Sequence, residues 1–343
     1  MTSKILVAGG GGYIGSVLCE TLLDEGYEVI CFDRFFFGKK TIRHLLEKEN
    51  FMVIQHDIRF SSEDIFTNVD CVIDLAGISN DPSCDLDPKV TEAINIKGTT
   101  RFAGLAKKNG VKRYIYSSSC SIYGAADHEQ LTEDSLINPV SLYAKTKIAS
   151  EQMLKDLSDD NFCVVLLRNA TVYGFSPRMR FDLLVNIMTA HAVTRGKIYV
   201  LGGGKQWRPN IHIKDLARAF IVFLNSPVEK INGEVFNVGS NEQNYQVIQV
   251  ANKIREVVPY VDLEVVPDDI DKRNYNVDFN KIKKILGFQV ERTVHEGAVE
   301  VKQAIERAEI DFDDIRTVTL KYYKYLLEAE KILNEVKLDG ILF

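Results

Sequence analysis

The sequence predicts an α/β protein: a doubly wound parallel sheet with a smaller α/β lobe. Two observations favour this class. Through the first half of the chain, short apolar runs alternate with amphipathic segments, as they do where each strand of a parallel sheet is followed by a helix. The first apolar run, Ile5 to Ala8, breaks into glycines and then enters an amphipathic segment, Ser16 to Glu25. Strand, glycine turn and helix form the opening unit of such folds.

The glycine turn has the spacing of a phosphate-binding loop. Gly9 would allow the tight turn, Gly12 would let the backbone approach a diphosphate, and Gly15 would let the helix pack close to the strand. The amino end of the helix adds free N–H groups and a partial positive charge. Glycines also mark plain turns, so this pattern is weak evidence by itself.

An acidic residue follows at the distance expected for a Rossmann-type dinucleotide site. The second apolar strand, Glu28 to Phe32, has Asp33 at its carboxyl end. A carboxylate there accepts hydrogen bonds from a ribose 2′-OH and repels a 2′-phosphate, so Asp33 predicts NAD rather than NADP. Arg34 softens that preference, and the plainer interpretation of Asp33 is a surface turn residue.

The third and fourth predicted strands, Phe51 to Gln55 and Asp70 to Leu75, also end in candidate ligand contacts. After the third strand, Asp57 could bond an adenine amino group while Ile58 packs on the ring. Equally, Asp57 could cap a turn. The fourth strand runs into small residues at 76–77, which would let the backbone lie against a cofactor.

A long helix is predicted from Asp87 to Asn109, and Gly110 ends it. Asn95 lies mid-helix, where asparagine has poor propensity, so it either bonds across to the sheet or faces solvent. The fifth strand, Val111 to Tyr116, then delivers the serines at 117–119 to the carboxyl edge of the sheet, where ligands bind in such folds.

Composition excludes several other classes. The net charge of −6 and the isoelectric point near 5.7 argue against general binding to nucleic acid or to anionic membranes. The first strand begins close to Met1, so we expect no signal peptide, and no apolar run is long enough to span a bilayer. The cysteines and histidines lack ligand-like spacing, so we expect reduced thiols in the cytoplasm and no metal.

Tyr143 and Lys147 form the candidate chemical centre, because residues four apart share one face of the helix predicted to start near Pro139. A tyrosine has a pKa of about 10 and a base at neutral pH needs about 7, so some ~4 kcal/mol of phenolate stabilisation is required. One nearby cation lowers a pKa by about 1–3 units. Lys147 alone is therefore marginal, whereas Lys147 with a positive nicotinamide ring suffices. Ser119 can hydrogen-bond the same substrate oxygen.

The YxxxK spacing alone is weak evidence for a catalytic site, because a tyrosine and a lysine on an exposed face of a helix have the same spacing. Downstream of the glycine turn and the serine cluster it becomes strong. Together, these motifs resemble the extended short-chain dehydrogenase/reductases over roughly residues 1–305, and more narrowly the NAD-dependent nucleotide-sugar epimerase/dehydratases such as UDP-glucose 4-epimerase. The motifs are Gly9-x-x-Gly12-x-x-Gly15, Asp33, Asp57-Ile58, Ser117-Ser118-Ser119, Tyr143-x-x-x-Lys147 and Arg168-x-x-x-Val172-Tyr173-Gly174.

The resemblance implies roles for these residues. Tyr143 would take the proton from a sugar hydroxyl, usually O4, while the carbon-bound hydrogen moves to NAD⁺ as hydride. Lys147 would also hold the nicotinamide ribose, and Ser119 would orient O4. The implied cofactor-binding residues are Gly9, Gly12, Tyr13, Ile14, Gly15, Asp33, Arg34, Asp57, Ile58, Leu75, Ala76, Gly77, Asn95, Ser117, Tyr143 and Lys147.

The residues just after Ser119 separate the branches of this family. The 4,6-dehydratases carry Asp-Glu there, and the decarboxylating branch carries a glutamate at the Ser121 position. This sequence has Cys120-Ser121. The 3,5-epimerases place a cysteine at the Ser121 position, whereas here it stands one residue earlier, so Cys120 is interpreted as a packing residue that could still touch the sugar.

What remains is oxidation at C4, with or without return of the hydride. We predict a nucleotide-sugar 4-epimerase. The alternative is a 4-dehydrogenase or 4-ketoreductase, for example on a GDP- or dTDP-linked hexose or heptose. A different class is an NAD-sensing binding protein without catalysis, against which the joint presence of Ser119, Tyr143 and Lys147 argues.

Arginines in the second half are candidates for binding the substrate diphosphate. Arg208 lies in a segment that resembles the family's R-x-x-I-H-V-x-D, in which we expect Asp215 to cap a helix from Leu216 and His212 to pack beside it. A looser segment at 271–278 contains Arg273. Arg178 and Arg180 lie near a predicted helix start. For these two we weigh binding of the diphosphate and ordinary solvated charges equally. The candidate substrate-binding residues are Ser79, Asn80, Ser119, Cys120, Ser121, Asn169, Thr171, Arg178, Arg180, Asn186, Arg208 and Arg273.

Three regions are predicted: a Rossmann domain over 1–170, a mainly nucleotide-sugar-binding lobe over 171–309 with segments that return to the main sheet, and a helical extension over 310–343. In the extension, apolar residues repeat at helical spacing, which indicates a helix packed on its own subunit or an oligomer contact. The resemblance implies a homodimer formed by the helices that bear Asn95 and Tyr143.

Overall fold

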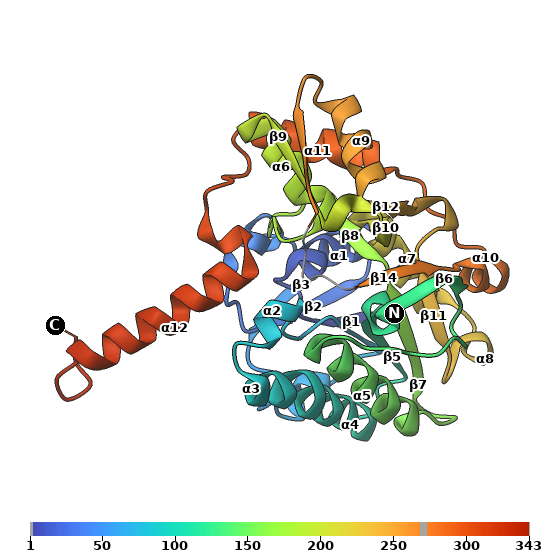
Figure 1. The fold of residues 1–343 in the computed structure, drawn as a ribbon. Helices are drawn as coiled ribbons and strands as arrows, with labels where there is room; N and C mark the ends of the chain where they lie inside the picture. The colour runs from blue at the N-terminus through green and yellow to red at the C-terminus, as the bar shows by residue number, and fades with distance from the viewer. Residues whose placement is uncertain (1–2, 268–272, 343) are drawn as a thin grey trace.

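A seven-stranded parallel sheet forms the centre of the protein (Figure 1). The structure, a computed structural model, describes residues 3–267 and 273–342. The strand order is β11-β7-β5-β4-β1-β2-β3. These strands are β1 (Lys4–Ala8), β2 (Glu28–Asp33), β3 (Phe51–Gln55), β4 (Cys71–Asp74), β5 (Arg113–Ser119), β7 (Cys163–Asn169) and β11 (Val235–Val238). The predicted doubly wound α/β class is confirmed.

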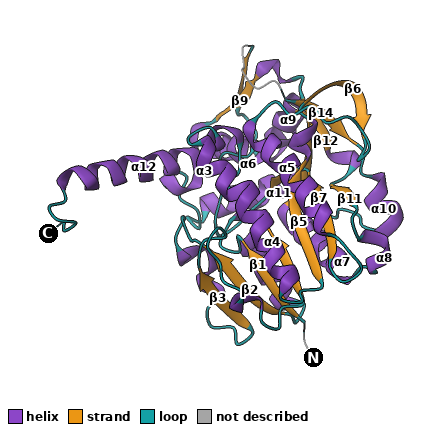
Figure 2. Ribbon diagram, turned by 90° about the horizontal axis from the view of Figure 1, so that it is seen from below, coloured by secondary structure: helices purple, strands orange, loops and turns teal. Residues whose placement is uncertain are grey.

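Helices cover both faces of this sheet (Figure 2). In β1, Ile5 and Val7 join one apolar core while Leu6 and Ala8 join the other, because successive side chains of a strand point to opposite faces. Helices α1 (Tyr13–Asp24) and α7 (Ile213–Asn225) pack in the first core. Helices α4 (Thr99–Lys108) and α5 (Leu142–Leu157) cover the opposite face. A sheet buried on both sides explains the continuous apolar runs of the sequence.

The long helix predicted over 87–109 is interrupted. It consists of α3 (Pro88–Glu92), a π-helical turn at Ala93–Gly98 and then α4. Asn95 sits in the π turn, where its side chain accepts from the backbone N–H of Ile78 at 2.8 Å and donates to the Ile78 carbonyl at 2.9 Å. Of the two alternatives, Asn95 therefore bonds across toward the sheet, and the π turn aims it there.

The second half builds most of a smaller lobe on the carboxyl side of the sheet. Its strands pair as β12-β10-β8, as β13-β9, and as β14 with β6 from the first half. They are β6 (Ala125–Leu131), β8 (Thr171–Tyr173), β9 (Lys197–Leu201), β10 (Trp207–His212), β12 (Asn244–Gln246), β13 (Asp262–Val266) and β14 (Asn274–Val277). The remaining helices before the extension are α2 (Asp81–Cys84), α6 (Leu184–Arg195), α8 (Val228–Ile231), α9 (Val247–Val257), α10 (Asn280–Leu286) and α11 (Val294–Glu306). From this half, β11 and α7 return to the main sheet.

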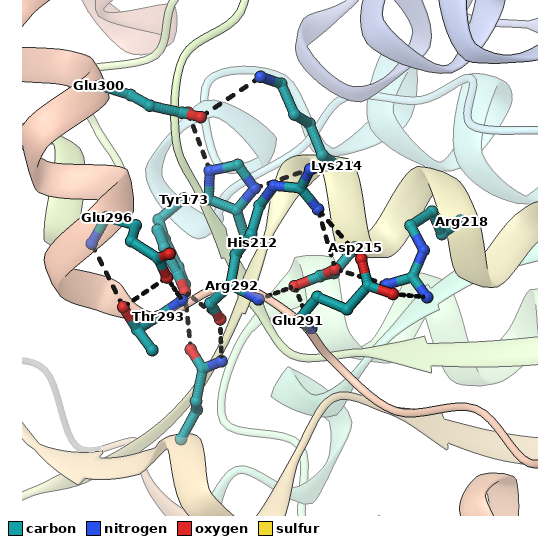
Figure 3. Close-up of polar contacts among 11 residues, drawn as sticks. Tyr173, His212, Lys214, Asp215, Arg218, Glu291, Arg292, Thr293, Glu296 and Glu300 are labelled. Atoms are coloured by element: carbon teal, nitrogen blue, oxygen red, sulfur yellow. Dashed lines mark hydrogen bonds and ion pairs between the residues drawn. The ribbon is translucent and has the colours of Figure 1, made fainter.

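A polar network around the buried side chains of His212 and Asp215 joins α7 to α11 (Figure 3). His212, not Asp215, is the N-cap of α7, since its Nδ1 accepts from the backbone N–H of Lys214 at 3.2 Å while its Nε2 contacts Glu300 at 2.9 Å. Asp215 lies in the first turn and accepts from the backbone N–H groups of Glu291 and Arg292 at 3.1 and 2.9 Å. The expected capping role of Asp215 is wrong, because its carboxylate ties the chain before α11 to α7 instead.

Glu300 makes this network sensitive to acid. Burial raises the pKa of Glu300, but bonding to His212 and the charge of Lys214 outweigh burial and lower the pKa to about 2. Because the folded pKa lies below the unfolded value of about 4.3, the stabilisation is present above pH 4.3 and is lost as pH falls toward 2. We expect Glu300→Gln to destabilise the fold by about 1–3 kcal/mol at pH 7 and by less at pH 3.5. Urea unfolding at both pH values measures this, and an equal difference at both would contradict it.

The extension forms α12 (Thr319–Val336), which projects away from the body (Figure 1). Thr319 is buried, and the rings of Tyr322 and Tyr323 pack on Phe37. From Lys321 to Leu342 the described residues include no buried side chain. The prediction that this helix packs on its own subunit is therefore confirmed only for its first turn. Within the described residues, no helix is long and apolar enough to cross a membrane.

Candidate active site

A cavity of about 680 Å³ opens at the carboxyl edge of the main sheet. Its lining comes from the ends of β1, β2, β4, β5 and β7 and from the smaller lobe. Parallel strands end at one edge, so residues that follow different strands meet there. Every candidate cofactor and substrate residue lines this cavity except Asn95, Cys120 and Asn186.

The glycine turn fits a diphosphate. Gly9 has φ +80°, and a side chain on it would meet the backbone of Leu75 at 2.9 Å. On Gly15, a methyl group would lie 2.7 Å from the Cα of Gly10. Gly12 is the N-cap of α1 and has no side chain to cap the first-turn N–H groups. The structure thus holds an uncapped helix amino end against a bare backbone, as anion binding requires.

Asp33 lines the cavity at the end of β2. Its carboxylate accepts from the backbone N–H groups of Gly11 at 2.9 Å and Phe35 at 2.6 Å. Burial raises the pKa of Asp33, and these two donors oppose that rise. Each oxygen keeps a lone pair for a ribose hydroxyl. Arg34 lies 2.7 Å from Asp57.

Asp57 caps a turn, which is one of its two predicted roles. It accepts from the backbone N–H and the side chain of Arg59, both at 2.9 Å. Burial raises the pKa of Asp57, but the bonds from Arg59 and Arg34 outweigh it and lower the pKa to about 2. Contact with adenine remains a prediction for Asp57 and Ile58.

We expect Asp33→Ala to weaken NAD binding by roughly 10- to 100-fold, because a hydrogen bond to a charged group contributes about 1.5–3 kcal/mol. NADP binding should change little, since the carboxylate that repels a 2′-phosphate is removed together with the ribose acceptor. Titration calorimetry with both cofactors measures the ratio. Equal loss of both would remove Asp33 from the ribose site.

The three candidate catalytic side chains meet in the cavity. Ser119 ends β5, and Tyr143 and Lys147 lie on α5, whose N-cap Ser141 accepts from the N–H of Ala144 at 3.2 Å. The Lys147 Nζ donates to the Ser117 carbonyl at 2.6 Å and lies 5.8 Å from the centre of the Tyr143 ring.

Burial shapes the ionisation of this pair. It raises the pKa of Tyr143, although a hydrogen bond with Ser119 works in the opposite direction. It also lowers the pKa of Lys147 to about 8, against the attraction of Asp74. The polypeptide alone therefore favours a neutral phenol, which strengthens the expectation that Lys147 is not sufficient and that a second cation is needed.

A buried ion pair supports the serine cluster from behind. Arg168 on β7 contacts Glu151 on α5 at 2.9 Å, and both side chains are almost fully buried. Ser118 donates to the same carboxylate at 2.5 Å, and Asn169 donates to Ser117 at 2.9 Å. These bonds fix the end of β5 against α5, so Ser119 and Tyr143 are held by two rigid elements.

The two predicted arginine segments come together on the other side of the cavity. Arg208 is buried and donates to the backbone carbonyl of Arg273 at 2.5 Å. Arg273 lies 3.1 Å from Asp81. In the looser segment, Asp271 and Lys272 lie outside the described residues.

The other candidates have distinct surroundings. Arg180 is paired with Asp182 at 2.8 Å and donates to Ser79 at 3.2 Å, while Asn80 donates to Asp182 at 2.7 Å. Arg178 lies deeper. Ser121 and Thr171 line the cavity.

Three candidate residues, Asn95, Cys120 and Asn186, do not line the cavity and lie next to residues that do. The Cys120 thiol points into the core and donates to the Arg168 carbonyl at 3.1 Å, as its interpretation as a packing residue predicts. Asn186 donates to the Tyr13 hydroxyl at 3.0 Å and to the Arg180 carbonyl at 3.1 Å. With Asn95, these residues position neighbours rather than face the cavity.

Sequence reasoning missed one wall of the cavity. Phe36 and Phe37, from the loop after β2, and Thr319 and Tyr323, from the base of α12, also line it. The run of three phenylalanines directly after Arg34 was the only local signal of this wall. Nothing local predicts that a segment near residue 320 meets it.

Comparison with known proteins decides the family. The sequence model of the NAD dependent epimerase/dehydratase family matches residues 5–239. The chain belongs to this family. It is an NAD-dependent enzyme, and the predicted family and cofactor are confirmed.

Three similar proteins illustrate the range of the family. The chain is 30% identical to UDP-glucuronic acid decarboxylase 1 of Arabidopsis thaliana, over 86% of this chain and 68% of that protein. It is 28% identical to UDP-glucose 4-epimerase of Bacillus subtilis, over 85% of this chain and 94% of that protein. The structure of MoeE5 in complex with UDP-glucuronic acid and NAD has a TM-score of 0.78 and 26% identity, over 89% of this chain and all of that one. The first two names denote different reactions, a decarboxylation and a 4-epimerisation, and the third protein binds a nucleotide sugar and NAD.

Proposed function

We propose that this enzyme is a nucleotide-sugar 4-epimerase, which oxidises C4 of a nucleotide-diphosphate sugar and reduces the 4-keto sugar from its other face. The observation that carries this proposal is the convergence of Ser119, Tyr143 and Lys147 in the cavity that also holds the glycine turn. When bound there, NAD supplies a reversible hydride acceptor. The geometry and the relatives named above support C4 chemistry, and the stereochemical outcome is our inference.

In this proposal Tyr143 is the base and then the acid. Its phenol takes the O4 proton as C4 is oxidised and gives it back when the ketone is reduced. Ser119 donates a hydrogen bond that orients O4. The Lys147 ammonium, fixed on the Ser117 carbonyl, supplies one of the two positive charges that the phenolate needs, and the oxidised nicotinamide ring would supply the other. Because Lys147 is buried and Tyr143 and Ser119 are partly buried, their electrostatic effect is larger than it would be in water.

Ser121 argues against two other reactions of the family, dehydration and decarboxylation. It lines the cavity, it is buried, and its hydroxyl has no hydrogen-bond partner among the residues that the structure describes. A serine has no proton-transfer group suited to loss of water or to decarboxylation, for which related branches place an acid at or beside this position. We infer that Ser121 binds a sugar hydroxyl.

Arg208 and Arg273 are the proposed ligands of the substrate diphosphate. Guanidinium groups suit this anion because their N–H donors are arranged as a fork. Both line the cavity on the smaller lobe. The diphosphate would hold the nucleotide in place while the oxidised sugar turns.

Nuclear magnetic resonance tests the proposal. The enzyme is incubated with a catalytic amount of NAD⁺ and with UDP-, GDP- and dTDP-linked sugars in turn. Interconversion of C4 epimers without net NADH supports the proposal. Stoichiometric NADH would replace it with the 4-dehydrogenase alternative, and absence of reaction with any sugar in a NAD-loaded enzyme would favour a binding protein.

We also propose a cytoplasmic homodimer. Helices α4 and α5 lie side by side on one face of the sheet, as a contact between two helix pairs requires (Figure 2). All six cysteines are free and buried, which suits a reducing compartment. Native mass spectrometry measures the assembly, and a monomer at micromolar concentration would contradict the dimer.

A further inference from the structure

Arg178 is a buried cation with unused donors. Its side chain is 5% exposed, and its guanidinium lies 3.7 Å from the centre of the Phe37 ring. Nη2 donates to the Thr319 hydroxyl at 2.9 Å. Among the residues that the structure describes, no acceptor lies within hydrogen-bond reach of Nε or Nη1. A buried, charged donor left in this state is unfavourable unless a ligand satisfies it.

The surroundings of Arg178 place it on the cofactor side of the cavity. Ser176, two residues earlier, donates to the Tyr13 carbonyl at 2.8 Å and contacts the Ser16 hydroxyl at 3.1 Å. The Tyr13 hydroxyl donates in turn to the Gly174 carbonyl at 2.7 Å. The chain that carries Arg178 therefore lies on the first turn of α1.

Two independent features thus face the same part of the cavity. One is the uncapped amino end of α1, which offers backbone N–H groups. The other is the guanidinium of Arg178, held on Phe37, four residues beyond Asp33. The glycine turn contains no cationic side chain of its own. An anion between these features would be a diphosphate attached to the ribose that Asp33 binds.

We propose that Arg178 binds the diphosphate of NAD, and that Thr319 at the base of α12 holds Arg178 in place for it. The C-terminal segment is then part of the cofactor site. This assignment replaces the two earlier alternatives for Arg178, binding of the substrate diphosphate and a solvated charge. It depends on NAD binding and not on the reaction at C4, so it stands or falls separately from the proposed epimerase activity.

Arg180 differs from Arg178 although it is only two residues away. Its charge is balanced by Asp182, to which it donates from Nε at 2.8 Å and from Nη2 at 3.1 Å. The guanidinium of Arg178 has only a threonine hydroxyl as a hydrogen-bond partner in the described structure. Of these two arginines, Arg178 is therefore the one with guanidinium nitrogens that have no hydrogen-bond partner among the described residues.

Calorimetry of Arg178→Met with NAD, ADP-ribose, adenosine and UDP tests the proposal. NAD and ADP-ribose, which contain the diphosphate, should bind roughly 10- to 100-fold more weakly, whereas adenosine should bind within about twofold of the wild type. Thr319→Val, which keeps the shape of the side chain, should weaken NAD by roughly 3- to 10-fold. The control is Arg195→Met, which removes a guanidinium that lies 5.3 Å from the Phe312 ring centre and does not line the cavity. It should leave NAD binding unchanged.

Other outcomes overturn the proposal. Weaker binding of UDP with unchanged binding of NAD would return Arg178 to the substrate. Equal weakening of adenosine and NAD would show that the diphosphate is not involved. If Arg178→Met does not fold, as judged by circular dichroism, Arg178→Lys and Thr319→Val decide the question, and wild-type NAD affinity in both would overturn the proposal.

Discussion

Replacing Tyr143 with phenylalanine should lower turnover by roughly 10²- to 10⁴-fold, the usual contribution of a positioned acid or base. The change removes one hydroxyl and keeps the aromatic ring on α5, so NAD binding should stay within a few fold of the wild type. Steady-state kinetics with the best sugar of the panel, together with calorimetry of NAD, measures both quantities.

Tyr27→Phe is the matched control for this result. The Tyr27 hydroxyl donates to Asn225 at 2.9 Å and lies outside the cavity, so the variant loses the same group without losing activity. If Tyr143→Phe retained the activity of the wild type, Tyr143 would not be the base and the catalytic account would fail.

Gly15→Ala should weaken NAD binding and lower the stability of the fold. The added methyl group would meet the backbone of Gly10 at 2.7 Å and crowd the Gly9 carbonyl, so the glycine turn would have to open. Overpacking of this kind costs about 1–3 kcal/mol, which corresponds to a loss of roughly 5- to 100-fold in affinity together with a lower melting temperature. Calorimetry and thermal unfolding measure the two effects.

Gly104→Ala provides the comparison, because it lies in α4 and a methyl group there meets no atom of the described structure within 4 Å apart from its chain neighbours and the backbone of its own helix. Alanine is favoured over glycine in a helix by about 1 kcal/mol, so this variant should be slightly more stable and should bind NAD normally. Wild-type NAD affinity in Gly15→Ala would mean that the glycine turn does not need its close packing.

The sheet and the catalytic side chains could be predicted because local patterns encode them. Strands buried on both faces appear as short apolar runs, and the residues that follow them meet at one edge whatever lies between. Ser119 and Tyr143 were therefore predictable as neighbours. The same argument does not extend to the π turn. The local pattern there predicts a continuous α-helix, whereas the structure has a π turn in which Asn95 bonds to the backbone of Ile78.

Contacts between distant segments were not predictable. Arg178 and Thr319 are 141 residues apart and meet only because the extension folds back to the cavity. A helical repeat in the extension does not say which of its turns is buried. The ionisation of Tyr143 was predicted from charges alone, whereas burial, which the spacing of two residues does not reveal, is the largest influence on its pKa.

The central claim, oxidation and reduction at C4 of one bound sugar, is tested most directly with a substrate deuterated at C4. The account predicts that the label remains at C4 in both epimers after equilibration in ordinary water with catalytic NAD⁺, because the hydride that leaves this carbon returns to it. Conversion of the substrate with loss of deuterium to solvent, or with exchange at another ring carbon, would contradict it.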